Sequence, residues 1–212
     1  MRFQEPLNQV FDSEAKVRLL RFLCRRGGEW SGRRLADELR INPTTAHKAL
    51  RELRGTAVVD FRGVGRAFAY SLADDHYLVR EILRAVFQRE GQALGHVARF
   101  LQRTLGASVR STVVTAAIFG SVARRQERPT SDFDLLVLVR SPRAKRQVER
   151  ALNRRWESFT RSFGLPLAPY VNTVAEARRK RRRGTALFRE ILRAHQVLWG
   201  RPLEDVLRGR TA

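Results

Sequence analysis

Residues 118–139, with the sequence IFGSVARRQERPTSDFDLLVLV, leave few folds open to this chain. The stretch begins in a mostly apolar run, residues 113–119, that stops at Gly120-Ser121. It closes with five consecutive apolar residues, 135–139. Apolar runs of this kind are typical of strands that are buried on both faces. Two strands are therefore predicted, over residues 112–119 and 132–139, with a short helix over residues 122–126 between them.

Two aspartates stand at the start of the second predicted strand, separated by one phenylalanine. Side chains two positions apart lie on the same face of a strand, so Asp132 and Asp134 should point the same way while Phe133 points into the core. Neighbouring carboxylates repel each other unless a cation lies between them, and oxygen ligands suit Mg²⁺ or Mn²⁺. The alternative is a pair of solvated aspartates in a turn before a strand.

The glycine and serine upstream predict a place for phosphate. Glycine lets a phosphate approach the backbone, and the N-terminus of the following helix offers free N–H groups to an anion. A phosphate cradle that faces a carboxylate pair and its metal ion is suited to phosphoryl transfer.

The spacing of Gly120-Ser121, ten residues, and then Asp132-Phe133-Asp134 resembles the signature of the polymerase-beta-like nucleotidyltransferases. The closest likeness is to the minimal nucleotidyltransferases, and it spans roughly residues 107–200. This resemblance implies a mixed sheet flanked by helices, an NTP as substrate or ligand, and Mg²⁺ or Mn²⁺ as cofactor. Asp132 and Asp134 would be the catalytic residues and metal ligands. The nucleotide-binding residues would be Gly120, Ser121, Arg124 and Ser131.

The chain also departs from that family's pattern. Arg125 and Gln126 stand where the family has a glycine that is often followed by a glutamate. The family's third carboxylate, which helps deprotonate the attacking hydroxyl, lies on a later strand. The strand predicted over residues 167–173 has no Asp or Glu, and Glu176 just beyond it is the candidate substitute. The second domain is therefore either an active enzyme or a domain that only binds nucleotide or a partner protein.

The N-terminal residues predict three helices followed by a hairpin. The helices begin after Ser13 (or Asp12), after Ser31 and at Pro43, and the hairpin strands are residues 58–62 and 67–72. This order resembles the winged helix-turn-helix regulators of the ArsR/MarR type, which implies that the third helix enters the DNA major groove. The DNA-binding residues would be Thr44, Thr45, His47, Lys48 and Arg51 in that helix, with Arg62 and Arg66 in the wing. Winged helices also serve as dimerisation or protein-docking modules.

The expected fold class is α+β, with three parts. Residues 1–75 form the winged helix, residues 76–106 are linking helices, and residues 107–212 form the nucleotidyltransferase-like domain. The linking helices are expected to build the interface of a two-fold homodimer. Beyond residue 139, helices are predicted over 142–163, 174–183 and 185–197, and a strand over 167–173.

The charge of the chain points to a polyanionic partner. It carries 42 Lys and Arg against 21 Asp and Glu, a net charge of +21. A genome that favours arginine would explain why Arg outnumbers Lys, but not the shortage of acids. The run Arg178–Arg183 fits either phosphate binding or a solvated basic turn. With no signal peptide, no apolar stretch that could span a membrane and one cysteine, the chain is expected to be cytoplasmic and free of disulfides.

These features predict a DNA-binding protein that transfers a nucleotide from an NTP, with Mg²⁺, to a hydroxyl of a protein or nucleic acid. In related minimal nucleotidyltransferases the acceptor can be a toxin tyrosine of a toxin–antitoxin pair or a tRNA end, and the winged helix could autoregulate such an operon. The alternative is a transcription regulator whose second domain is catalytically degenerate.

Overall fold

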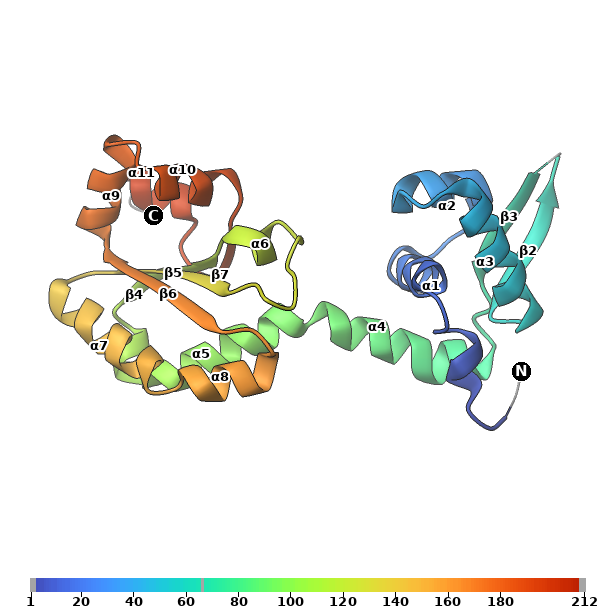
Figure 1. Cartoon of the computed structure of the whole chain (residues 1–212), viewed down its shortest axis with the longest axis horizontal. Helices are drawn as coiled ribbons and strands as arrows, with labels where there is room; N and C mark the ends of the chain where they lie inside the picture. The colour runs from blue at the N-terminus through green and yellow to red at the C-terminus, as the bar shows by residue number, and fades with distance from the viewer. Residues whose placement is uncertain (1–2, 66, 210–212) are drawn as a thin grey trace. The chain divides into compact units, whose positions relative to one another are not determined.

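The computed structural model describes residues 3–65 and 67–209, and the chain divides into two compact units, residues 1–92 and 93–212. Each unit has its own sheet and its own hydrophobic core (Figure 1). The predicted α+β class is confirmed. Among the described residues, no helix has both the length and the apolar composition needed to cross a membrane.

The first unit has the helix and strand order of a winged helix-turn-helix. Its sheet is antiparallel, in the order β1-β3-β2, because a two-residue strand at Trp30 adds to the predicted hairpin. Its elements are a 3-10 helix η1 (Pro6–Gln9), α1 (Glu14–Arg26), β1 (Trp30–Ser31), α2 (Gly32–Leu39), α3 (Pro43–Gly55), β2 (Val59–Val64), β3 (Ala67–Leu72), a π-helix η2 (Leu78–Leu83) and α4 (Arg84–Gly91).

Side-chain caps fix where the three main helices of this unit begin. The Ser13 hydroxyl accepts a hydrogen bond from the Lys16 N–H, and Ser31 does the same for Arg34. Asn42 caps α3 through the Thr44 N–H, with proline at the first helical position. Each cap satisfies a backbone donor that the helix itself leaves unpaired. The predicted starts of all three helices are therefore confirmed.

A buried lysine joins α1 to α3. The Lys16 side chain is 5% exposed and forms ion pairs with Asp12 at 2.8 Å and with Glu52 of α3 at 2.9 Å. Burial lowers the pKa of Lys16, but the hydrogen bonds and charges of the two carboxylates outweigh burial and raise it. The lysine therefore stays charged and helps to hold α3, the predicted recognition helix, against α1.

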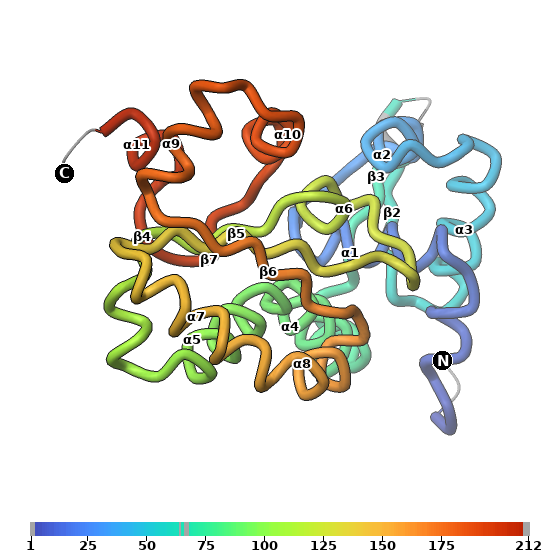
Figure 2. The backbone as a smooth tube through the Cα atoms, turned by 60° about the vertical axis from the view of Figure 1, so that its left-hand side comes forward, coloured from blue at the N-terminus to red at the C-terminus, as the bar shows by residue number. Residues whose placement is uncertain are grey.

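The second unit is a four-stranded sheet between two layers of helices. The strand order is β6-β5-β4-β7; β5 and β6 run parallel, and the other neighbouring pairs are antiparallel. Figures 1 and 2 show α5, α7 and α8 on one face of the sheet, and α9, α10 and α11 on the other. The elements are α5 (Ala93–Arg110), β4 (Val113–Ile118), α6 (Gly120–Ala123), β5 (Phe133–Val139), α7 (Pro142–Asn153), α8 (Trp156–Phe163), β6 (Leu167–Thr173), α9 (Val174–Arg182), α10 (Ala186–Arg193), β7 (Gln196–Gly200) and α11 (Leu203–Arg208).

Strand β5 divides its side chains between the two helical layers. Phe133, Leu135 and Val137 belong to the core formed with α5, α7 and α8. Leu136 and Leu138 belong to the core that contains Phe188 and Ile191 of α10. Because alternate residues of a strand face opposite sides, Asp134 lies on the α10 side of the sheet.

Three predicted helices differ from the structure. The helix expected over residues 185–197 ends at Arg193, because Ala194 has an extended backbone (φ −150°, ψ 102°) and residues 196–200 form strand β7. The helix expected over residues 142–163 is broken at Arg154-Arg155 into α7 and α8, because Arg155 has left the helical conformation (φ −121°, ψ 8°). Trp156, the first residue after the break, faces outward and is 51% exposed. The short helix expected over residues 122–126 begins two residues earlier, at Gly120, and is a single turn.

Candidate functional site

Asp134 is the buried end of the aspartate pair. It is the second residue of β5 and half-buried, whereas Asp132 lies just before the strand and is exposed. Phe133 between them is 4% exposed and packs in the core. The structure thus places the two carboxylates at the N-terminal end of β5, an inner strand of the sheet, which holds Asp134 in position.

Gly120 lies directly against Asp134. It follows β4, and the backbone of Phe119 before it donates a hydrogen bond to the Asp134 carbonyl oxygen at 3.1 Å. The φ angle of Gly120 is +68°, which glycine adopts without steric cost. A Cβ atom built here would overlap Asp134 Oδ2 and lie 3.0 Å from Cγ. No other residue type leaves this carboxylate where it is.

The electrostatics of Asp134 favour a cation. Burial raises the pKa of Asp134 above its ordinary value, the charges of Asp132 and Glu190 raise it further, and Arg124 opposes them. A carboxylate that the fold holds in a negative surrounding is relieved by a bound metal ion. The donor set, two carboxylates with an open edge, therefore fits Mg²⁺ or Mn²⁺. Within the described ranges, no three His, Cys, Asp or Glu side chains are gathered closely enough to hold a metal ion together.

The predicted nucleotide-binding residues lie around this pair in different roles. Ser121 is the second residue of α6 and is half-buried. Because α6 is a single turn, this helix does not supply the anion-binding N-terminus that the sequence suggested. Ser131 closes a tight loop, accepting from the Arg128 N–H at 2.9 Å through its hydroxyl. Arg124 follows α6 and forms an ion pair with Glu190 at 2.8 Å. The structure thus brings Gly120 and Asp134 into contact and commits the Ser131 and Arg124 side chains to partners within the chain.

Arg125 shows why a glycine suits the position after Arg124. Its φ angle is +56°, in the left-handed region that is uncommon for residues with a Cβ atom. The backbone geometry of this turn is therefore kept although the glycine is absent.

Glu176 does not belong to this site. It caps α9 together with Thr173 and forms an ion pair with Lys145 at 3.2 Å. In the parallel register of β5 and β6, Asp134 is opposite Ala168, whereas Val139 is opposite Thr173. Five residues of strand, about 17 Å, separate the two ends. Glu176 follows the C-terminal end of β6, whereas Asp134 lies beside the N-terminal end of that strand.

The face of β6 beside Asp134 carries no carboxylate. Its residues there are Ala168, Tyr170 and Asn172. Lys180 of α9 donates hydrogen bonds of 2.7 Å to the Tyr170 hydroxyl and to Asn172 Oδ1. A lysine therefore occupies this face of the strand, and the carboxylate near Asp134 comes from elsewhere.

Glu190 of α10 is the acidic residue that sequence reasoning missed. Besides its ion pair with Arg124, its charge contributes to the raised pKa of Asp134. It lies 56 residues after Asp134, so no local pattern connects them. The alternation of side chains along β5 could have indicated the relation, because it puts Asp134 on the face of the sheet that the apolar residues of α10 cover.

The predicted recognition helix presents its polar side chains to solvent. In α3, Thr44, Thr45, His47, Lys48 and Arg51 are all exposed. Thr44, His47, Lys48 and Arg51 line a hollow of about 690 Å³ together with Arg54 and two aromatic residues. Arg62 of the wing is instead bound to Glu29, with Nε–Oε1 and Nε–Oε2 distances of 2.7 and 2.9 Å. Arg66 lies outside the described residues.

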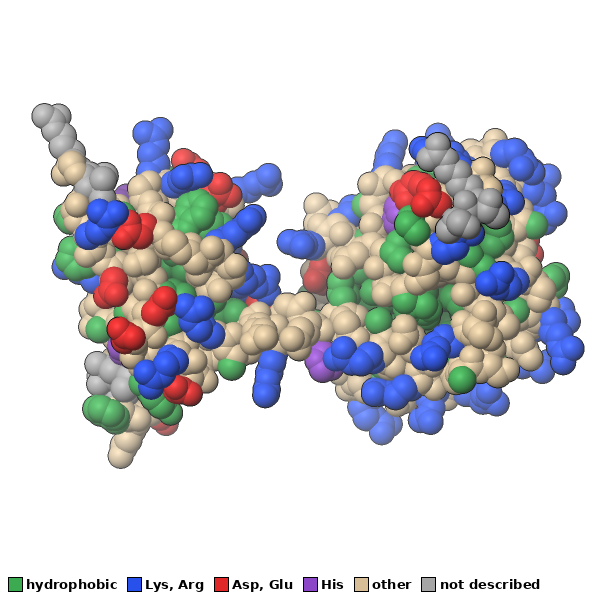
Figure 3. Space-filling model, turned by 180° about the vertical axis from the view of Figure 1, so that it is seen from behind, with side chains coloured by type: hydrophobic (Ala, Val, Ile, Leu, Met, Phe, Trp, Pro, Cys, Tyr) green, Lys and Arg blue, Asp and Glu red, His purple; other side chains and the backbone are tan. Residues whose placement is uncertain are grey.

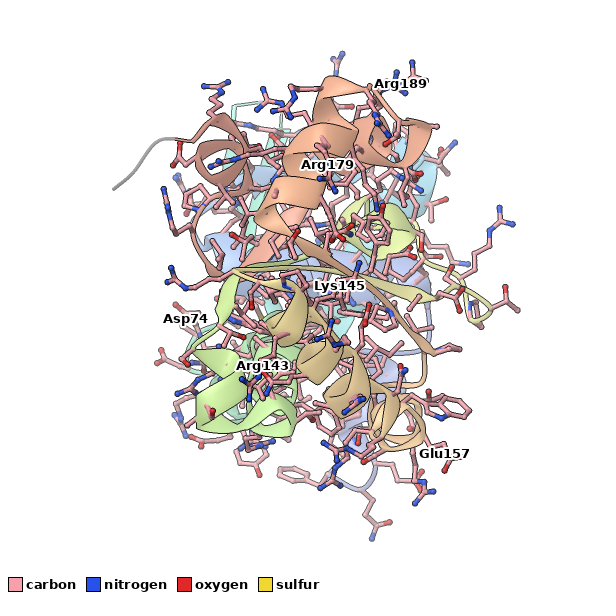
Figure 4. All side chains as sticks on the ribbon, turned by 90° about the vertical axis from the view of Figure 1, so that its left-hand side faces the viewer. Asp74, Arg143, Lys145, Glu157, Arg179 and Arg189 are labelled. Atoms are coloured by element: carbon pink, nitrogen blue, oxygen red, sulfur yellow. The ribbon has the colours of Figure 1, made fainter. Side chains whose placement is uncertain are left out.

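The positive charge is concentrated in the second unit. Residues 93–212 contain 25 Lys and Arg against nine Asp and Glu, and residues 1–92 contain 17 against 12. Basic side chains are spread over the visible surface of the second unit, at the right of Figure 3, and far outnumber acidic ones there. Figure 4 shows Arg179 and Arg189 on the helices at one face of the sheet, and Arg143 on α7 at the other. The second unit therefore carries the stronger attraction for polyanions.

Comparison with known proteins identifies a family for part of the second unit. Residues 100–192 match a family model described as a nucleotidyltransferase domain, which confirms that prediction over this range. No curated protein sequence matches the chain. Among solved structures, reduced HlyU from Vibrio cholerae N16961 is similar at 18% identity and a TM-score of 0.34, covering 41% of this chain and 83% of its own. NolR from Sinorhizobium fredii gives 21% identity and a TM-score of 0.35, covering 41% and 82%.

Proposed function

Since residues 100–192 match a nucleotidyltransferase domain, we propose that this chain transfers a nucleotide from an NTP to a hydroxyl group of another molecule. The observation that carries the proposal is the close approach of Gly120 to the Asp134 carboxylate, one of the two carboxylates of the Asp132–Asp134 pair. Only glycine leaves this carboxylate in place, and the surroundings of the carboxylate favour a cation. Burial of β5 alone does not call for a half-buried carboxylate at position 134, since its charge opposes folding.

The chain's own residues divide the work of this reaction. Asp132 and Asp134 would hold Mg²⁺, which when bound offsets the charge of the phosphates. The Ser121 hydroxyl and the Arg124 guanidinium would hold the triphosphate. The acceptor oxygen bonds to the α-phosphorus, the bond from this phosphorus to the bridging oxygen of the β-phosphate breaks, and pyrophosphate leaves. The proton of the acceptor hydroxyl passes to a carboxylate.

Of the two acceptor classes, nucleic acid is favoured over protein. A surplus of 16 positive charges lies in residues 93–212, where the acceptor would bind. A positively charged surface of this kind attracts the phosphate backbone of a nucleic acid, whereas it gives no such attraction for a neutral or basic protein. A tRNA end fits this surface, and a toxin tyrosine is the competing acceptor.

The winged helix is proposed to bind DNA as a homodimer and to autoregulate a toxin–antitoxin-type operon. The exposed Thr44, Lys48 and Arg51 on α3 support major-groove contact. A second candidate function remains for the other unit. Because β6 has no carboxylate beside Asp134, a nucleotide-sensing regulator without turnover is the alternative.

A labelling assay tests the proposal. The protein is incubated with Mg²⁺ and each α-³²P-labelled NTP, alone, with total tRNA, or with the protein encoded by the neighbouring gene. The control is the double variant Asp132→Asn, Asp134→Asn. Label that moves to an acceptor only with the unaltered protein supports nucleotidyl transfer. Mg²⁺-dependent NTP binding without transfer, lost in the variant, supports the nucleotide-sensing regulator instead.

A further inference from the structure

Strand β6 lacks the acidic residue that would complete the aspartate pair, and the structure assigns one from a different element. We infer that Glu190 of α10 is the third acidic residue of the site, and that a bound triphosphate activates it by drawing Arg124 away. This inference rests on the proposed nucleotidyl transfer, because it concerns the same site.

The fold brings Glu190 to the side of the sheet where Asp134 lies. Leu136 and Leu138, on the same face of β5 as Asp134, share a core with Phe188 and Ile191, the neighbours of Glu190 in α10. Figures 1 and 2 show α6 and α10 on this same side of the sheet. Apolar packing on both sides of Glu190 in the helix therefore holds it on the Asp134 side of the sheet, where its charge acts on Asp134, while its own side chain stays 47% exposed.

Arg124 connects Glu190 to the phosphate-binding turn. It stands four residues after Gly120, and its guanidinium donates to Glu190 Oε1 at 2.8 Å. Both residues line one hollow of about 580 Å³ on the surface of the second unit. The residues that line it are Arg124, Ala186, Arg189, Glu190, Arg193 and Ala194. With three arginines and one glutamate, this hollow suits an anion that carries several charges.

The ion pair is suited to exchange. Its side chains are 38% and 47% exposed, and ion pairs at such exposure contribute little to stability. Arginine binds phosphate through two parallel charge-assisted hydrogen bonds, which are stronger than a single exposed contact. A triphosphate beside Gly120 therefore competes well for Arg124. Glu190 then loses its counter-charge.

Once Arg124 has left, Glu190 can act as the third carboxylate, which β6 does not supply. The carboxylate adds its negative charge to those of Asp132 and Asp134, so that the site binds a divalent cation more tightly once nucleotide is present. The released carboxylate also accepts the proton of the attacking hydroxyl as the new oxygen–phosphorus bond forms and pyrophosphate departs. The site is thus assembled by its own substrate, and hydroxyls are not activated before NTP binds.

The test compares three variants of the full chain. Glu190→Gln removes the charge and keeps the shape, and Glu190→Asp keeps the charge. Glu204→Gln is the matched control, because Glu204 is an equally exposed glutamate (49%) of the same unit that pairs with His195. Mn²⁺ affinity is measured by electron paramagnetic resonance, with and without an NTP analogue that has a methylene group between the α- and β-phosphates. Transfer of labelled nucleotide is measured in parallel.

With the analogue bound, Glu190→Gln should weaken Mn²⁺ binding about tenfold, as loss of a supporting group near a metal does. Glu190→Asp and Glu204→Gln should bind Mn²⁺ like the unaltered protein. Without the analogue the deficit of Glu190→Gln should be smaller, because Glu190 of the unaltered protein is then still paired with Arg124. Transfer should fall on the order of 100-fold in Glu190→Gln, as expected for loss of a proton acceptor.

Equal Mn²⁺ affinity of Glu190→Gln and Glu204→Gln in the presence of the analogue overturns the inference, whatever the transfer rates. This result leaves the proposed function standing if the unaltered protein transfers label. If the unaltered protein transfers nothing to any acceptor, the proposed enzymatic function fails, and the Mn²⁺ comparison still decides the role of Glu190. Because Glu190 is exposed, its variants should fold, which unchanged melting temperatures would verify.

Discussion

Gly120 and Asp134 occupy adjoining space with no room for a side chain between them. The glycine is the first residue of α6 after β4, and the aspartate is the second residue of β5. A hydrogen bond of 3.1 Å from the Phe119 N–H to the Asp134 carbonyl oxygen joins the two segments. One residue provides a backbone with a positive φ angle (68°), and the other provides the charge. The requirement for glycine here is thus set by the position of a carboxylate and not by the turn alone.

Gly120→Ala should abolish Mg²⁺-dependent NTP binding and lower the stability of the protein. The φ angle alone costs roughly 1–2 kcal/mol for a residue with a Cβ atom, and the overlap with Asp134 adds to this. The matched control is Gly164→Ala, because Gly164 also has a positive φ angle (77°), but a Cβ atom added there would meet nothing within 4 Å. Thermal unfolding and NTP titration of both variants give the measurement. Equal behaviour of the two variants would contradict the role given to Asp134.

The raised pKa of Asp134 predicts an unusual pH dependence. Because folding raises this pKa above its unfolded value, the charged carboxylate opposes folding. The stability that this group gives the fold is complete below the unfolded pKa and is lost as the pH rises through the folded one. Asp134→Asn should therefore raise the melting temperature at pH 7, and the difference should shrink towards zero near pH 3.

Mg²⁺ should reverse this difference at pH 7, since it stabilises the unaltered protein and has no carboxylate to bind at position 134 in the variant. Asp37→Asn, in an exposed position of α2, serves as the control and should show neither effect. A melting temperature of Asp134→Asn below that of the unaltered protein at pH 7 without Mg²⁺ would show that the carboxylate stabilises the fold instead.

Sequence patterns predicted β4, β5 and β6 of the second unit because burial and alternation are local properties, whereas the start of β7 was assigned to a helix. The apolar run after Asp134 fixed both the strand and the inward direction of Phe133, and both features are found in the structure. Side-chain caps at Ser13 and Ser31 likewise marked helix starts, since a cap is formed within three residues.

The parts that were missed depend on register and on long-range contacts. Glu176 follows β6 closely in sequence, but the parallel pairing with β5 places it at the far end from Asp134. The relation of Glu190 to Asp134 arises only when α10 packs on the sheet. The break between α7 and α8 was also invisible, because apolar residues continue at helical spacing on both sides of Arg155.

The winged helix is predicted to bind DNA through α3 in a salt-dependent manner. Lys48→Ala with Arg51→Ala should weaken binding and reduce the slope of log K against log salt concentration by about one for each phosphate contact removed. The control is Arg89→Ala, an exposed arginine of α4. Electrophoretic mobility shifts with the upstream region of the gene, at several salt concentrations, give the measurement. An unchanged slope in the double variant would place the contact elsewhere.

Arg62 should contribute less to DNA binding than its place in the wing suggests. Glu29 holds its guanidinium, with an Nη2–Oε2 distance of 2.5 Å, and lowers the positive charge of the wing. Glu29→Gln should therefore tighten DNA binding severalfold, while Arg62→Ala should weaken it less than Lys48→Ala does. If Glu29→Gln leaves affinity unchanged at low salt, the wing lies away from the DNA.

Nucleic-acid binding by the second unit should depend on the arginines that line the hollow with Glu190. Arg189 and Arg193 of α10 line the hollow that contains Arg124, and neither makes an ion pair or a side-chain hydrogen bond with another described residue. Arg189→Ala with Arg193→Ala should weaken tRNA binding about tenfold to 100-fold at low salt, because two phosphate contacts are lost. Fluorescence anisotropy with labelled tRNA gives the measurement.

The matched control removes the same charge from the opposite face of the sheet. Arg143→Ala with Arg146→Ala, at exposed positions of α7, should weaken tRNA binding only slightly, through the general loss of two positive charges. If both double variants weaken binding equally, the attraction belongs to the whole basic surface, and α10 does not guide the acceptor. If only the α10 variant is affected, the acceptor binds beside Glu190, where its hydroxyl meets the proton acceptor and the α-phosphate.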